Sequence, residues 1–134
     1  MSRSGYVDEM DDYLAMGRWR QAVKRAIEGK RGQAFLRELA EAMDAMPEKV
    51  LITDDLINKD GDCCTIGVVC KSRGVDVSNV DPDDPQDVGD AVGIARAMAA
   101  EIEFENDEDF WGRDESPEAR WKRMRKWVAE NTRD

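Results

Sequence analysis

Four stretches of the chain place apolar residues at the spacing of one helical face. They predict helices over about Asp8–Glu28, Gln33–Met46 and Pro85–Glu103, with a fourth that begins near Ser116. The third stretch has the most regular pattern and predicts one continuous central helix, whose apolar face comprises Val88, Ala91, Val92, Ala95, Met98, Ala99 and Ile102.

Residues that commonly start and stop helices support these limits. The pairs Asp84–Pro85 and Ser116–Pro117 each combine an N-cap side chain with proline at the first helical position. The short polar link Gly29–Gly32 predicts that the first two helices form an antiparallel hairpin.

The region between the second and third predicted helices is less regular. Val50–Thr53 favours a strand and predicts a small β-hairpin, while Asn58–Asp62 is typical of a turn. Cys63–Arg73 fits either a helix or a strand. Its length and the following Gly74, a typical C-cap, favour the helix.

Composition fits one mostly α-helical domain spanning residues 1–134, with about five helices around the central helix. Of the 134 residues, 41% are hydrophobic, which is enough for a single core. No apolar run approaches the length of a membrane span, and the first residues do not resemble a signal peptide. Three closely spaced cysteines are typical of a reducing compartment, where they would be buried thiols. We therefore expect a soluble, cytoplasmic protein.

The net charge of −10 is concentrated in the middle of the chain. Residues 49–110 contain 16 acidic and 5 basic residues, whereas the segments on either side are close to neutral. An acidic surface of this kind can imitate the phosphates of DNA, but many soluble proteins are acidic without doing so.

The chain has no histidine, so the commonest general base and the commonest neutral metal ligand are missing. The serines and glycines form neither a nucleophile turn nor a phosphate-binding loop. Three thiols alone do not complete a structural zinc site. The carboxylates in Glu101–Asp109 do not exclude a catalytic acid–base pair, although a solvated acidic loop explains them better. We expect no catalytic residues, cofactor or metal, and a protein that acts by binding.

An acidic stretch with aromatic residues is the first candidate for a binding surface. Aromatic side chains are enriched at binding hot spots, and neighbouring carboxylates would steer a basic partner. This hypothesis selects Glu103, Glu105, Asp107, Glu108, Asp109, Phe110 and Trp111.

Basic residues on the first and last helices are the second candidate. If the two helices are neighbours, their cations form one face that could follow a phosphate backbone. This alternative selects Arg18, Arg20, Lys24, Arg25, Lys30, Arg31, Arg123 and Lys126.

Several segments resemble an uncharacterised family of small proteins encoded in phages and prophages of proteobacteria. They include Arg18–Lys24, Gly32–Leu39, Met46–Lys49, Arg73–Asp76, Asp81–Pro85, Glu105–Glu108 and Pro117–Trp121. The resemblance covers most of the chain and implies a phage setting, but it identifies no catalytic residues.

Small phage proteins often disable a host system by binding to it. We therefore expect a non-enzymatic inhibitor of a bacterial defence system, similar to an anti-CRISPR protein, that binds a host protein or complex. The alternative is a small nucleic-acid-binding regulatory module. Neither requires a membrane.

Overall fold

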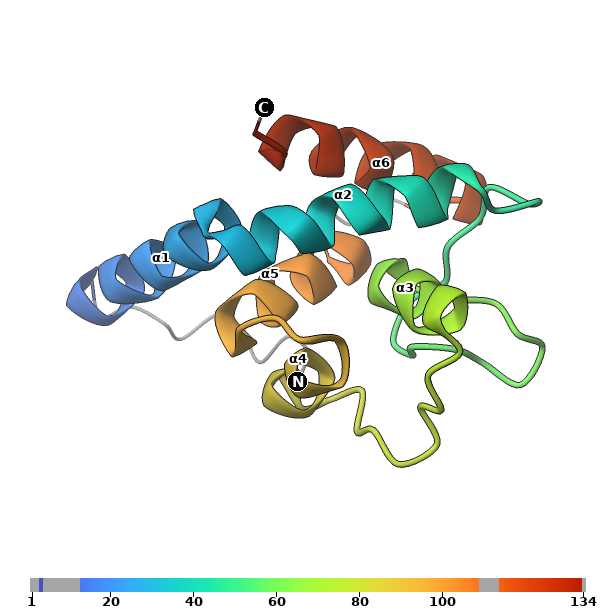
Figure 1. The fold of residues 1–134 in the computed structure, drawn as a ribbon, viewed down its shortest axis with the longest axis horizontal. Coiled ribbons are helices and arrows are strands. Elements are labelled where there is room, and N and C mark those ends of the chain that lie inside the picture. Colours follow the sequence, from blue (N-terminus) through green and yellow to red (C-terminus); the bar gives the residue numbers. More distant parts are fainter. Residues whose placement is uncertain (1–2, 4–12, 109–113, 134) are drawn as a thin grey trace.

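The computed structural model describes residue 3, residues 13–108 and residues 114–133. Within these ranges the chain forms six helices and no β-strand (Figure 1). The helices are α1 (Tyr13–Glu28), α2 (Lys30–Asp44), α3 (Thr65–Arg73), α4 (Pro85–Val92), α5 (Arg96–Asp107) and α6 (Pro117–Asn131). The predicted α-helical class is confirmed, with one helix more than expected.

The chain passes almost directly from the first helix into the second. Only Gly29 separates α1 from α2, and its backbone is extended, with φ −71° and ψ 167°. Figure 1 shows α2 leading away from the end of α1 without folding back along it. The predicted antiparallel hairpin is therefore wrong, because Lys30–Gly32 belongs to the first turn of α2 and leaves too short a link.

The predicted helix over Pro85–Glu103 is two helices. Gly93 adopts a left-handed conformation with φ 81°, and its N–H donates to the carbonyl of Gly89. This is a common way for a helix to end, and the Cβ of most residues would strain that backbone. After the break, α5 packs against α4 and also contacts α1, α3 and α6. The apolar pattern that predicted one helix therefore belongs to two helices packed against each other.

Residues between α2 and α3 form a loop and not the small β-hairpin predicted near Val50–Thr53. Its strand-like element is a single antiparallel bridge between Ile57 and Cys63. The predicted turn at Asn58–Asp62 is present, with the Asn58 side chain accepting hydrogen bonds from the backbone of Asp60 and Asp62. The loop is thus ordered by local turns, so β-favouring residues alone did not produce a strand.

The predicted helix caps are confirmed. The Asp84 carboxylate accepts hydrogen bonds from the backbone of Gln86 and Asp87, and Ser116 Oγ accepts one from Ala119. The ambiguous stretch after Cys63 forms helix α3, which ends at Gly74 in a left-handed conformation. The cap residues therefore marked these helix ends correctly.

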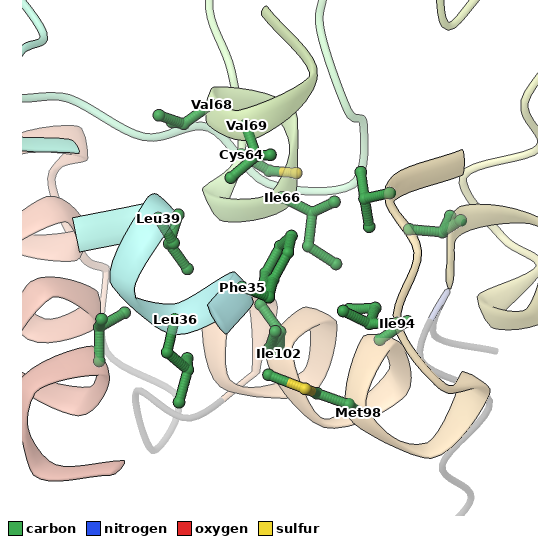
Figure 2. Close-up of a cluster of buried hydrophobic side chains, with 14 of the residues drawn as sticks. Phe35, Leu36, Leu39, Cys64, Ile66, Val68, Val69, Ile94, Met98 and Ile102 are labelled. Atoms are coloured by element: carbon green, nitrogen blue, oxygen red, sulfur yellow. The ribbon is translucent and has the colours of Figure 1, made fainter. Parts of the chain in front are cut away.

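The core lies where α2, α3 and α5 meet. Figure 2 shows Phe35 of α2 between Ile66 of α3 and Ile102 of α5, with Met98 beside them. Helix α6 adds Met124 and Val128, which are fully buried. None of the helices in the described ranges combines the length and apolar composition of a membrane span.

Candidate functional site

The acidic stretch predicted to contact a partner is only partly exposed. The side chains of Glu103 and Asp107 are buried, with residue exposures of 1% and 8%. Glu105 and Glu108 are half-buried. Asp109, Phe110 and Trp111 lie outside the described residues. The prediction that Glu103 and Asp107 face a partner is thus wrong, because these residues lie one turn apart on the inward face of α5.

A guanidinium group from a distant part of the chain accounts for this burial. Arg3 Nε and Nη2 donate to the two carboxylate oxygens of Asp107, at 2.5 and 2.9 Å. Arg3 Nη1 donates to the backbone carbonyl of Asp55 at 3.2 Å and to Cys64 Sγ at 3.6 Å. Glu103 Oε2 lies 3.2 Å from the same nitrogen. One buried arginine therefore faces two buried carboxylates.

A second set of hydrogen bonds holds this cluster to the surrounding loop. Asn106 Oδ1 accepts from both the backbone and the hydroxyl of Thr65, at 3.1 and 2.7 Å. Asn106 Nδ2 donates to the Ile52 carbonyl and to Asp107 Oδ1. The backbone N–H of Asp54 also donates to Asp107. These bonds join the end of α5 to the start of α3 and to the preceding loop.

Glu103 is the least satisfied member of the cluster. Neither of its carboxylate oxygens accepts a hydrogen bond from a described residue, despite the nearby Arg3. Burial raises the pKa of the Glu103 carboxyl to about 8, against the opposing effect of Arg3, and Asp107, Asp83 and Asp81 raise the pKa further. Glu103 therefore changes its charge near neutral pH.

We expect this burial to make stability depend on pH. Because the pKa of Glu103 is higher in the folded than in the unfolded chain, its stabilising contribution is complete below about pH 4.5 and is lost as pH rises to about 8. The loss is at most about 1.4 kcal/mol per pH unit, the value for one proton. Denaturation between about pH 6 and about pH 8 should show this decline in the wild type and a flatter profile in Glu103→Gln. A decline of equal slope in both proteins would contradict the assignment to Glu103.

The cysteines are free and buried, as predicted. Burial raises the pKa of both Cys63 and Cys70 to about 11, and it also raises the pKa of Cys64. The Cys64 sulfur accepts a hydrogen bond from the backbone of Gly67, which caps α3. Buried thiols with raised pKa values are poor nucleophiles at neutral pH, so their arrangement favours packing and capping over catalysis.

Part of the predicted basic set is bound within the protein. Arg20 forms a bidentate ion pair with Glu101, in which Nη1 and Nη2 donate to the two carboxylate oxygens at 3.0 and 3.2 Å. Arg123 pairs with Glu115 and donates to the carbonyls of Glu105 and Asn106 at the end of α5. The remaining members of the set are exposed, namely Arg18, Lys24, Arg25, Lys30, Arg31 and Lys126.

Helices α1 and α6 line one groove, of about 470 Å³, with α5 between them. Its lining includes the cations of Arg20, Lys24 and Arg133, but also the carboxylates of Glu28 and Glu101. Arg133 is itself paired with Glu28 at 3.3 Å. The groove is therefore of mixed charge, which is a poor match for a phosphate backbone.

The sequence pattern did not predict a second groove, of about 430 Å³, between the end of α2 and α3. Apolar side chains contribute much of its lining, namely Ala42, Ala45, Met46, Pro47, Val50 and Val68. The carboxylates of Glu48, Asp60 and Asp62 also line it and are exposed, and among the described residues they form no ion pair. Lys71 lies there too and donates to the Gly61 carbonyl at 2.8 Å. Only the folded chain brings these two segments together, so no single motif could have shown the groove.

Comparisons with protein-family models, curated proteins and solved structures found no match to this chain. The described residues also contain no group of three or more Cys, Asp or Glu side chains arranged to hold a metal ion. The two grooves and the buried ionic cluster are therefore the candidate functional features of the described residues.

Proposed function

We propose that this chain is a non-enzymatic, phage-encoded accessory protein that binds a host protein, as an inhibitor of a bacterial defence system such as a CRISPR complex. It would act in the cytoplasm of the bacterial host. The phage setting comes from the family resemblance. The groove between α2 and α3 supports the binding part of the proposal.

The chemistry of this groove favours one kind of partner. Met46, Pro47 and Val50 offer apolar surface, which a partner's apolar side chain would remove from water. Glu48, Asp60 and Asp62 place negative charge beside that surface. A segment that carries both apolar and basic side chains, such as an amphipathic basic helix, matches both features.

A charged side chain placed in the groove should prevent this binding. Ala45 is exposed at the end of α2 and lines the groove, so Ala45→Arg would obstruct it and repel a basic partner. We expect the affinity for the captured host protein to fall by about tenfold or more. Ala34→Arg is the matched control, because Ala34 is also exposed on α2 but does not line the groove.

Capture from host lysate, followed by mass spectrometry and titration of the retained protein, measures this effect. The wild type and Ala34→Arg should retain the same host protein, and Ala45→Arg should lose it. Equal retention by all three proteins would remove the groove from the proposal.

The same preparations test the nucleic-acid alternative. Binding through the exposed cations of α1 and α2 would retain labelled DNA or RNA, and retention would weaken steeply as salt rises. Loss of that retention in a Lys24→Ala, Arg31→Ala double variant, with Ala45→Arg unaffected, would replace our proposal with the alternative.

A further inference from the structure

The Arg3 side chain is held as a ligand is held in a binding site. Its planar group meets both oxygens of Asp107, the carbonyl of Asp55, the sulfur of Cys64 and the carboxylate of Glu103. The side chains of Arg3 and Glu103 are at most 1% exposed, and that of Asp107 is 4% exposed. A fork of two parallel hydrogen bonds onto one carboxylate is the geometry by which proteins recognise a guanidinium group.

The walls of this pocket are held together by bonds that do not involve Arg3. Asn106 links α5 to Thr65 at the start of α3 and to Ile52 in the loop. The backbone of Asp54 is hydrogen-bonded to Asp107. The described residues whose polar groups surround Arg3 lie more than 50 positions away in the sequence. The pocket is thus built by one part of the chain and filled by another.

We propose that this pocket is a guanidinium-binding site that Arg3 occupies from within the chain and that an arginine-like group from another molecule can occupy in its place. The Asp107 carboxylate, a carbonyl and a sulfur surround the bound group beside the Glu103 carboxyl, so the site selects for positive charge and for several donors in one plane. A lysine ammonium is a compact charge without this planar fork, so it fits the site poorly. The inference does not depend on the groove between α2 and α3.

Removing the internal occupant tests the site. Arg3→Ala should have a lower melting temperature than the wild type, and agmatine, a small guanidinium compound, should raise it again. Cadaverine, an amine without a guanidinium, should not. Isothermal titration should show agmatine binding to Arg3→Ala at least about tenfold more tightly than to the wild type, whose pocket is filled. Adding Asp107→Asn to Arg3→Ala should abolish agmatine binding.

A peptide probe distinguishes the two sources of a guanidinium group. Acetyl-Ser-Arg-Ser-amide copies residues 2–4, and acetyl-Ser-Lys-Ser-amide is its control. Tighter binding of the arginine peptide than of agmatine identifies an arginine side chain of a polypeptide as the preferred ligand. Tighter binding of agmatine identifies a free guanidinium compound.

A second variant keeps the test decisive if Arg3→Ala does not fold. Arg3→Gln leaves a neutral side chain on the same segment, and the same titrations apply to it. The proposal is overturned if neither variant binds a guanidinium probe, or if the amine and lysine probes bind equally well.

Discussion

Replacing Asp107 with alanine is expected to lower the free energy of unfolding by about 3–5 kcal/mol. Arg3 would lose both hydrogen bonds of its fork and remain buried, with Glu103 as its nearest carboxylate. A buried charge without its partner is costly because the protein interior does not replace the water that solvated it. Chemical denaturation of Asp107→Ala and the wild type at one pH measures the difference.

The control for this change is an exposed aspartate. Asp90 lies on α4 and accepts a hydrogen bond from Gln86, so Asp90→Ala should change stability by no more than about 0.5 kcal/mol. A double change, Arg3→Met with Asp107→Leu, should recover much of the loss because it removes both charges. If Asp107→Ala were as mild as Asp90→Ala, the buried pair with Arg3 would not form in solution.

Replacing Gly67 with alanine is expected to destabilise the protein by about 1–3 kcal/mol. A Cβ at this position would overlap the backbone carbonyl oxygen of Leu56, which also accepts a hydrogen bond from Cys64 at 3.0 Å. Helix propensity alone predicts the opposite sign, because alanine favours a helix over glycine by about 1 kcal/mol. The clash with the backbone should outweigh that gain, since neither α3 nor the loop can move without breaking other contacts.

Gly17 provides the matched control on α1. A Cβ there would meet no atom of the described residues within 4 Å, and the position is exposed within the helix. Gly17→Ala should therefore stabilise the protein by about 0.5–1 kcal/mol. Thermal or chemical denaturation of both variants measures the two effects. A gain in stability for Gly67→Ala would show that α3 does not pack against Leu56 as closely as the structure has it.

Local signals in the sequence predicted the helix ends well. Asp84 and Ser116 cap their helices, and Gly74 ends α3, because these preferences arise from hydrogen bonds and backbone angles within a few residues. The sequence pattern did not predict that the helix ends at Gly93, because the apolar spacing continues through this residue. Two helices packed against each other need the same spacing of apolar residues as one long helix, so the glycine was the only local sign of the break.

The candidate sites were harder to predict because they depend on contacts between distant residues. Glu103 and Asp107 looked like part of an acidic surface, and nothing nearby in the sequence indicated that Arg3 would meet them. Their four-residue spacing on a helix was a usable signal, since it places both carboxylates on one face. No sequence motif indicated the groove between α2 and α3, because its apolar and acidic residues come from separate segments that the fold brings together.

Phage plating on bacteria that carry a CRISPR defence tests the proposed function most directly. Cells would express the wild type, Ala34→Arg or Ala45→Arg at equal levels, after denaturation has shown that all three proteins are equally stable. We expect the wild type and Ala34→Arg to increase plating of a targeted phage, and Ala45→Arg not to do so. Plating that the wild type leaves unchanged, or that Ala45→Arg increases as much as the wild type does, would contradict the proposal.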